Sequence, residues 1–335
     1  MSLNSQEEAV ADFASVADPY RQELLAYCYR MLGSVDDAED QVQETMLRAW
    51  RAYSEFEGRS SLRTWLYRIA TNNCLRAMEN RGRRPLPSDL SNPAADPEGP
   101  LASTRPEIAW LQPMPDALVA GPSADPASVV SSRAGMRLAL IAALQYLPSR
   151  QRAVLILRDV LGWHATEVAA LLDVSVAAAN SALQRARAHL AQAGITEDEL
   201  REPGDPAHRA LLDRYVKAFE SADVAALTDL LRSDAALEMP PQAYWFAGRD
   251  QVVRFLRSRV LTAPGRFRLL PTAANGQPAL AAYEMSAAGA LEAHAVQVLT
   301  IRDGQVSRIV SFNDGRLLRL FGFPAQLPAA GLHRP

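Results

Sequence analysis

A proline-rich stretch in the middle of the sequence prevents the chain from folding as one continuous domain. Ten of the 22 prolines lie between Pro85 and Pro126, and no sustained apolar periodicity runs through them. Proline lacks a backbone N–H and clashes with the preceding helical turn, so this stretch cannot be a long helix. We therefore expect a linker over residues 83–132, extended and partly disordered, with separate domains on either side. The length of 335 residues suits two or three such domains.

The sequence before the linker predicts an all-α domain over residues 8–82. Its apolar residues recur at the three- and four-residue intervals of one helix face. A break at Gly33-Ser34 is followed by an acidic first turn, which is typical of a new helix. The apolar residues at helical spacing in the first two helices are Leu24, Tyr27, Cys28, Met31, Val42, Met46, Leu47 and Trp50.

The sequence after the linker predicts a second all-α domain, over residues 133–195. One helix begins at Pro148-Ser149, and a shorter one covers about residues 165–172. After a tight turn, Ser175 caps a longer helix. Two helices joined by a few residues, the second longer and capped, form the helix-turn-helix pattern.

A third domain, with an α+β fold, is predicted over residues 204–325. Two helices are expected at about 206–221 and 223–231, and another after Gly248. The rest of this domain has the pattern of strands, with Asp303-Gly304 as a two-residue hairpin turn. The expected strands are Arg266–Ala273, Ala279–Ser286, Glu292–Arg302 and Val306–Phe312. Helices followed by an antiparallel meander indicate a cone with a curved sheet.

Charge is segregated along the chain, although the net charge is only −3. Between Arg59 and Arg84 there are seven arginines and one acid, Glu79, whereas residues 36–44 are rich in acids. The basic patch suits a polyanion, and the acidic block suits a basic or polar protein surface. The alternative for either patch is a solvated helix face. No apolar stretch is long enough to cross a bilayer, so we expect a cytoplasmic protein without a membrane partner.

The basic patch also contains aromatic and amide side chains, which together with cations suit a single nucleic acid strand. Its arginines alternate with Phe56, Trp65, Tyr67 and the amides Asn72 and Asn73. Bases can stack on such rings while the nucleic acid backbone follows the positive charge. The alternative is that Trp65 and Tyr67 are ordinary core aromatics.

The last helix of the middle domain has one apolar face and one polar face. A helix that lies in a DNA major groove presents such a polar face, with arginines near phosphates. Bidentate hydrogen bonds to bases are confined here to Asn180, Gln184 and Arg185. Many helical bundles share this spacing, so a plain bundle is the alternative. The apolar face consists of Val176, Ala179, Leu183, Ala186 and Leu190.

Two segments of the chain resemble the extracytoplasmic-function group of sigma factors. LLAYCYRMLGSVDDAEDQVQETMLRAWRAYSEFEGRSSLRTWLYRIATNNCLRAM is similar to their region two. LPSRQRAVLILRDVLGWHATEVAALLDVSVAAANSALQRARAHL looks like their region four. The resemblance implies a transcription initiation factor whose partners are core RNA polymerase and promoter DNA. It leaves the presence of an anti-sigma partner, the promoter sequence and the signal open.

The resemblance also assigns roles to particular residues. Contact with the polymerase is implied for an acidic set: Asp36, Asp37, Glu39, Asp40 and Gln43. Capture of the melted minus-ten strand is implied for Phe56, Arg59, Ser60, Ser61, Arg63, Trp65, Arg68, Asn72, Asn73 and Arg76. Recognition of the minus-thirty-five element is implied for Ser175, Ala177, Ala178, Asn180, Ser181, Gln184, Arg185 and Arg187.

The C-terminal domain resembles the SnoaL-like branch of the NTF2 fold, through AANGQPALAAYEM and HAVQVLTIRDGQVSRIVSFND. Catalytic members of that fold place paired acids or an acid–histidine couple in the cone. Here Glu238 and His294 are the candidates for such a couple, with a core or rim histidine as the alternative. The expected pocket residues are Glu238, Trp245, Tyr283 and His294.

Two functions follow, of which the first is an alternative sigma factor regulated in cis by its C-terminal domain. The second is an NTF2-fold cyclase, isomerase or hydrolase, or a small-molecule sensor, fused to a DNA-binding module. We expect no enzyme activity and no cofactor. We also expect no metal, since Cys28 and Cys74 lack metal-ligand spacing. The linker segment WLQPMPD, residues 110–116, is too apolar for a spacer and should dock on a partner surface.

Overall fold

The computed structural model of the chain describes residues 13–79, 82–100, 104–105, 107–119, 135–192 and 206–328. The outer ends of the expected domains, at 8–12, 133–134, 193–195 and 204–205, lie outside the described residues, as do linker residues 120–132. Two compact units are present. The first consists of residues 1–84 and 118–195, and the second of residues 85–117 and 196–335. The second unit therefore includes much of the expected linker.

The N-terminal part of the first unit is a three-helix arrangement, as expected from its periodicity. Its helices are α2 (Arg21–Leu32), α3 (Val35–Ala52) and α4 (Leu62–Glu79), and all three pack against one another. Gly33 ends α2 in a left-handed conformation, with φ 70°. The Ser34 side chain then caps α3 by accepting a hydrogen bond from the Asp37 amide at 3.2 Å. Short 3-10 turns, η1 (Asp18–Tyr20) and η2 (Tyr53–Glu55), flank these helices.

The rest of the first unit contains the expected helix-turn-helix. Its helices are α6 (Leu138–Leu144), α7 (Ser149–Leu155), α8 (Ala165–Leu172) and α9 (Val176–Gln192), and α7 continues as the π-helix η5 (Ile156–Val160). Asp173 ends α8 with a left-handed φ of 55°. The Ser175 hydroxyl accepts a hydrogen bond from the Ala178 amide at 3.1 Å and caps α9. The prediction of a tight turn and a serine cap is confirmed.

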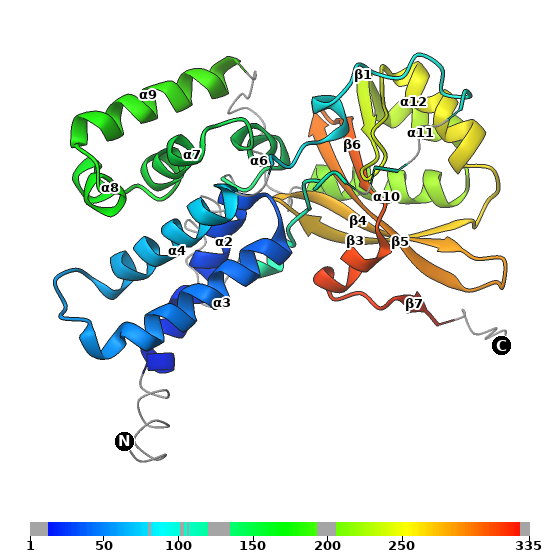
Figure 1. Cartoon of the computed structure of the whole chain (residues 1–335). Coiled ribbons are helices and arrows are strands. Elements are labelled where there is room, and N and C mark those ends of the chain that lie inside the picture. The colour runs from blue at the N-terminus through cyan, green and yellow to red at the C-terminus, as the bar shows by residue number, and fades with distance from the viewer. Residues whose placement is uncertain are drawn as a thin grey trace. The chain divides into compact units, whose positions relative to one another are not determined.

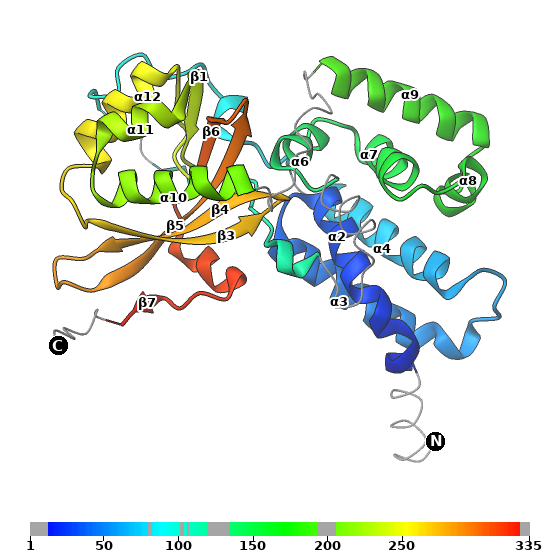
Figure 2. The same cartoon turned by 180° about the vertical axis from the view of Figure 1, so that it is seen from behind.

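The second unit is a strongly curved sheet covered by helices (Figures 1 and 2). The helices are α10 (Pro206–Glu220), α11 (Val224–Leu230) and α12 (Arg249–Phe255), and α12 continues as the π-helix η7 (Leu256–Val260). The strands are β1 (Leu231–Glu238), β2 (Trp245–Ala247), β3 (Phe267–Ala274), β4 (Gln277–Met285), β5 (Leu291–Arg302), β6 (Gln305–Phe312) and β7 (Gln326–Leu327). Their order is β2-β1-β6-β5-β4-β3, and β7 pairs with β5. A 3-10 helix, η8 (Gly315–Phe321), precedes β7.

The predicted meander is confirmed for β3 to β6, which pair antiparallel in chain order. Asp303 and Gly304 both have positive φ, 51° and 73°, as a two-residue hairpin turn requires. Sequence reasoning missed β1 as a strand and its parallel pairing with β6. The parallel partner is distant in sequence, so local spacing carries no signal for it. One apolar core joins the three helices to the sheet through residues such as Tyr215, Phe246 and Leu299.

Residues 85–117 of the linker belong to the second unit. It contains two short 3-10 turns, η3 (Pro87–Asp89) and η4 (Asp116–Leu118). Within WLQPMPD, Leu111 and Met114 are almost completely buried, at 1% and 0% exposure. The expectation that this segment docks agrees with the structure at Met114, whose amide donates to the Asn275 side chain at 2.9 Å, and at Pro115, which forms a β-bridge with Ala274.

Candidate functional surfaces and a cavity

Five of the residues predicted to capture a DNA strand form a stripe along one side of α4. Ser61, Trp65, Arg68, Asn72 and Arg76 are spaced by three or four residues, which places them on one helix face. Four of the five are exposed, and Trp65 is partly buried. The Ser61 hydroxyl also accepts a hydrogen bond from the Thr64 amide at 3.1 Å, so it caps α4. The helix itself thus sets the spacing of arginine and amide groups.

The loop before α4 adds aromatic rings to this stripe. Phe56 stacks on Trp65 with the ring centroids 4.8 Å apart, and Tyr53 stacks on Phe56 at 6.5 Å. Arg59 and Ser60 lie in the same loop and are exposed. Arg59 forms an exposed ion pair with Glu57 at 2.7 Å, which leaves it accessible to solvent.

Asn73 and Arg63 lie elsewhere than the predicted strand-binding surface. Asn73 is 3% exposed, accepts a hydrogen bond from Arg48 at 2.6 Å and donates one to Thr45 at 3.0 Å. It braces α4 against α3 and does not reach solvent, which corrects its assignment as a DNA contact. Arg63 pairs with Glu23 of α2 at 2.9 Å and is only partly exposed.

The polar face predicted on α9 is exposed. The members that face solvent are Ala177, Ala178, Asn180, Ser181, Gln184, Arg185 and Arg187. Ala179, Leu183 and Ala186 are buried on the opposite face, whereas Val176, at 40% exposure, is not part of the core. Arg187 makes two hydrogen bonds to Asp159 of η5, at 2.7 and 2.8 Å. Arg187 thereby connects α9 to η5 while it stays at the surface.

The acidic residues predicted to contact a protein are divided between the surface and the interior. Asp36, Glu39, Asp40 and Gln43 are exposed on one face of α3. Burial, together with Asp36 and Asp40, raises the pKa of Glu39 above its ordinary value. Asp37 is 8% exposed and forms an ion pair with Arg84, so it does not belong to the exposed face.

Two apolar side chains extend this acidic face of α3. Leu47 and Trp50 are 41% and 38% exposed, although their spacing suggested core positions. They follow Gln43 by four and seven residues, which keeps them on the same side of the helix. We define the α3 face as Asp36, Glu39, Asp40, Gln43, Leu47 and Trp50. An acidic surface that ends in exposed apolar groups is typical of a protein-binding site.

Within the first unit, the helix-turn-helix part packs on α4. The Tyr67 and Trp163 rings are 5.1 Å apart, and the Arg63 guanidinium lies over both. Arg68 of the α4 stripe donates a hydrogen bond to the Ala170 carbonyl at 2.9 Å. In this arrangement, α8 takes up part of the hydrogen-bonding capacity of the stripe.

Buried arginines join the same two parts of the first unit. Arg30 donates to the Gly135 carbonyl at 3.0 Å, and Arg152 donates to the Met31 carbonyl. Both are nearly inaccessible, and desolvation lowers the pKa of each to about 10. At neutral pH both remain charged and depend on these carbonyls for compensation.

The linker contacts the second unit at two ends. At one end, Met114 and Asn275 exchange hydrogen bonds, and the Asp116 side chain accepts one from the Gly276 amide at 2.8 Å. At the other end, the Ser88 amide donates to Glu238 at 2.9 Å.

Three of the four expected pocket residues serve structure instead. Glu238 is completely buried and pairs with Arg308 at 2.5 Å. Trp245 donates to the Ser91 carbonyl of the linker at 2.8 Å, and Tyr283 donates to the Pro324 carbonyl at 2.9 Å. The expected couple of Glu238 and His294 is not formed, because alternate residues of β1 face opposite sides of the sheet and Leu237 and Met239 face the cavity.

His294, the fourth of these residues, lines a cavity of about 210 Å³ inside the curved sheet. Five rings, those of Tyr215, Phe219, Tyr244, Phe255 and Phe267, contribute to its wall. The polar residues of the wall are Arg259, Arg266, Glu284, His294, Gln297, Ser311 and Asn313. Its wall thus combines apolar rings with hydrogen-bonding groups, as small-molecule sites commonly do.

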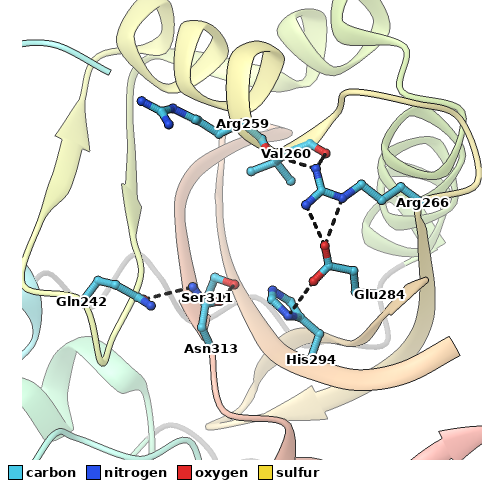
Figure 3. Close-up of polar contacts among 8 residues, drawn as sticks. All are labelled: Gln242, Arg259, Val260, Arg266, Glu284, His294, Ser311 and Asn313. Carbon is cyan, nitrogen blue, oxygen red and sulfur yellow. Dashed lines mark hydrogen bonds and ion pairs between the residues drawn. The ribbon is translucent and has the colours of Figure 1, made fainter. Parts of the chain in front are cut away.

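An arginine, a carboxylate and a histidine form a chain across this cavity (Figure 3). Arg266 donates two hydrogen bonds to Glu284 Oε1, at 2.7 and 3.0 Å. Glu284 Oε2 lies 3.2 Å from His294 Nδ1. Burial lowers the pKa of His294, Arg266 lowers it further, and Glu284 partly opposes the shift. Glu284 therefore takes the place beside His294 that the sequence suggested for Glu238. The signal that could have found it is the cross-strand position of β4 beside β5, which needs the register of the sheet.

Family models match three successive parts of the chain. Residues 16–84 match Sigma-70 region 2, residues 137–190 match Sigma-70 region 4, and residues 212–309 match the SnoaL-like domain. Among the described residues, no single helix is long and apolar enough to span a membrane.

Similar proteins cover most of the chain. It is 48% identical over 323 residues to the ECF RNA polymerase sigma factor SigG of Mycobacterium tuberculosis, covering 96% of this chain and 86% of that protein. It is 30% identical to the ECF RNA polymerase sigma factor SigJ of the same species, covering 85% and 86%. The crystal structure of SigJ matches with a TM-score of 0.62 and 25% identity, over 93% of this chain and 99% of that one.

Proposed function

The chain belongs to the ECF family of RNA polymerase sigma factors, and from this premise we propose that it binds core RNA polymerase and directs promoter-specific initiation. The observation that carries the proposal is the exposure, in one unit, of two faces whose residue types suit DNA, the α4 stripe and the polar face of α9. The first suits a single strand and the second suits a duplex major groove. Such activity takes place where promoters and polymerase lie, in the bacterial cytoplasm.

The α3 face is the proposed surface for core polymerase. Its exposed acids favour a basic partner. Leu47 and Trp50 add exposed apolar area, and covering this area with a partner protein would be favourable. Asp37 supports this surface indirectly, since its ion pair with Arg84 ties α3 to the segment after α4.

The α4 stripe and the α9 face are the proposed promoter-binding surfaces. Trp65 with Phe56 offers stacked rings to unpaired bases, and Arg68 and Arg76 offer charge to the strand. On α9, Asn180, Gln184 and Arg185 supply hydrogen bonds to base edges. Each surface is small, so promoter specificity is expected when polymerase holds both at a fixed separation.

We further propose that the C-terminal domain regulates the sigma regions in cis by holding the linker. Support comes from the burial of Leu111 and Met114 and from the linker hydrogen bonds to Asn275 and Glu238. A linker held at Ser88 and again at Asp116 has less length left to extend between two DNA-bound regions, so docking should restrain initiation.

We propose no catalytic step for the C-terminal domain. The position of Glu238, away from the cavity and paired with Arg308, supports this view. The Glu284–His294 pair favours acid–base chemistry as a second candidate, because a carboxylate that orients an imidazole is a common general base. Chemical conversion of a cavity ligand, abolished in His294→Ala, would support that candidate.

The test of the sigma function is run-off transcription with core RNA polymerase, from the region upstream of this chain's own gene. We expect transcript with the full chain and none with core polymerase alone. The double variant Gln184→Ala/Arg185→Ala should retain polymerase binding and lose most of the promoter-specific transcript. Absence of transcript here and at every other candidate promoter would contradict the sigma function.

A further inference from the structure

The Arg266–Glu284–His294 chain fixes which nitrogen of the imidazole faces the cavity. Glu284 Oε2 lies 3.2 Å from Nδ1, within ion-pair distance, so Nε2 lies on the other side of the ring and points away from Glu284 (Figure 3). Glu284 is the acid that pairs with His294, and the Phe267 and His294 ring centroids lie 5.7 Å apart. The downward shift of the His294 pKa keeps the ring neutral at pH 7. Neutral imidazole with Nδ1–H bonded to a carboxylate leaves Nε2 as an acceptor.

The charges around His294 in the cavity wall are compensated. Arg266 and Glu284 neutralise each other, and His294 is uncharged. The Arg259 guanidinium points away from Arg266, Glu284 and His294 (Figure 3). It donates hydrogen bonds to the carbonyls of Glu98 and Gly99 in the linker, at 2.7 and 2.9 Å. Beside His294 a charged ligand would meet only the mutually neutralised Arg266–Glu284 pair, which disfavours burial of a charge at this end of the cavity.

The size and lining of the cavity suit a compact ring system. A cavity of roughly 150 Å³ lined by apolar side chains can hold benzene, and this one has about 210 Å³ with five rings in its wall. One or two fused rings therefore fit. A hydroxyl or N–H on such a ring would satisfy the acceptor at His294.

The cavity wall is also continuous with the contacts that hold the linker. Arg259 belongs to both, as described above. On the opposite side, Asn313 lines the cavity and donates to the Gln242 side chain at 3.2 Å, and Gln242 forms a β-bridge with Thr104 of the linker. An occupant that fixes Arg259 and Asn313 would therefore also fix their linker partners.

We propose that this cavity binds an uncharged one- or two-ring compound that donates a hydrogen bond to His294, and that an occupied cavity holds the linker more tightly. The first half stands independently of any sigma activity. The second half rests on the proposed regulation in cis and deepens it, since it makes linker docking dependent on a small molecule.

The binding half is tested with four naphthalene probes and the full-length chain. The probes are 2-naphthol as donor, 2-methoxynaphthalene without a donor, 2-acetylnaphthalene as acceptor and 2-naphthoate as anion. We expect 2-naphthol to bind about fivefold tighter than 2-methoxynaphthalene, the effect of one hydrogen bond of about 1 kcal/mol. In His294→Leu this preference should vanish while 2-methoxynaphthalene still binds. No binding of any probe, tightest binding of 2-naphthoate, or an unchanged preference in His294→Leu would overturn the assignment.

The variant Glu284→Gln separates a positioning role from a merely structural one. Its amide would donate to Nδ1 while its oxygen still accepts from Arg266, so the imidazole proton moves to Nε2. The preference should then reverse, with 2-acetylnaphthalene binding tighter than 2-naphthol. The matched control is Asp213→Asn, which removes the charge of an exposed acid on α10 and should keep the original preference. A preference that stays with 2-naphthol in a folded Glu284→Gln variant contradicts the role of Glu284.

The linker half is tested by cleavage with a glutamate-specific protease. Glu98 is exposed, and its carbonyl is one of the two that Arg259 holds, so cutting after Glu98 requires local release of the linker. Saturating 2-naphthol should slow this cut severalfold and leave the cut after the exposed Glu57, in the other unit, unchanged. Binding of 2-naphthol without slower cleavage at Glu98 overturns the coupling alone. Because neither readout involves polymerase, a failure of the sigma function would be visible separately in transcription.

Discussion

Met114 and Asn275 are joined by two hydrogen bonds, each 2.9 Å long. The Met114 amide donates to the Asn275 side chain, and the Asn275 amide donates to the Met114 carbonyl. Asn275 has a left-handed φ of 56° in the turn between β3 and β4, which presents both of its polar groups to the linker. Beside it, Pro115 forms a β-bridge with Ala274. The linker is thus attached as an additional short strand at the end of a hairpin.

Weakening this attachment should increase initiation. Met114→Ala removes a fully buried side chain, at a cost to docking of about 2–5 kcal/mol. We expect faster protease cleavage after Glu98 or Glu107 in the linker and a higher yield of promoter-specific transcript. Leu90→Ala is the matched control, because Leu90 belongs to the same linker but is 40% exposed. Equal transcript yields from Met114→Ala and the unaltered chain would argue against regulation through the linker.

A charge on the apolar end of the α3 face should weaken polymerase binding. Leu47 is 41% exposed, so Leu47→Asp is expected to leave the melting temperature nearly unchanged. In a pull-down or fluorescence titration with core polymerase, we expect at least a tenfold loss of affinity. Val16→Asp, at a residue 36% exposed on the same unit, is the control and should bind normally. Normal assembly of Leu47→Asp would remove this residue from the proposed interface.

Loss of charge on the α4 stripe should change the salt dependence of strand binding. Replacing Arg76 by alanine removes one phosphate partner, so the slope of log affinity against log salt should fall by roughly 0.7. The measurement is anisotropy of a labelled single-stranded minus-ten oligonucleotide with the holoenzyme. Arg21→Ala removes an exposed arginine that pairs with Asp18 outside the stripe, and its slope should not change. An unaltered slope for Arg76→Ala would mean that this arginine does not contact the strand.

Opening the contact between α4 and the helix-turn-helix part should expose the stripe. Trp163→Ala removes the ring whose centroid lies 5.1 Å from that of Tyr67. The loss of this packing should destabilise the contact by about 3–5 kcal/mol. Arg68 is then released from the Ala170 carbonyl more often. The chain without polymerase should bind the same oligonucleotide more tightly than the unaltered chain does. Trp50→Ala, which removes an exposed ring, is the control, and equal affinities for both variants would count against masking of the stripe.

Binding of 2-naphthol should be lost in acid. The ionisable groups that line the cavity are Tyr215, Tyr244, Arg259, Arg266, Glu284 and His294. Protonation of His294 turns Nε2 into a donor, which cannot accept from the naphthol hydroxyl. Since the pKa of His294 is lowered from 6.5, affinity should be constant between pH 7 and 8 and fall only below pH 6.5. Titration of the dissociation constant from pH 5 to 8 tests this, and the dependence should be absent in His294→Leu.

The elements of the fold follow from local patterns, whereas several site residues do not. The cap at Ser175 and the turn at Asp303-Gly304 depend on neighbouring residues, and both agree with the sequence. The partner of His294 depends on the pairing of β4 with β5, so the resemblance to catalytic members of the fold suggested Glu238, whereas the structure places Glu284 beside His294. Which side of a helix is covered is equally non-local. Leu47 was expected in the core and is exposed, whereas Asn73 was expected at the surface and is buried. The reason is that α4 covers one side of α3 and leaves the other side open.

The two units are interleaved in the sequence, with residues 85–117 belonging to the unit that is completed by residues 196–335. During synthesis the linker therefore emerges before the sheet on which it docks. At bacterial rates of 5–20 residues per second, the ribosome needs roughly 10 s to make the sheet after the helix-turn-helix has left it. Throughout that interval Leu111 and Met114 have no surface to cover them. A nascent chain thus passes through a period in which both sigma regions are present without the proposed restraint by the C-terminal domain. A chain cut after residue 201 would lack this restraint permanently.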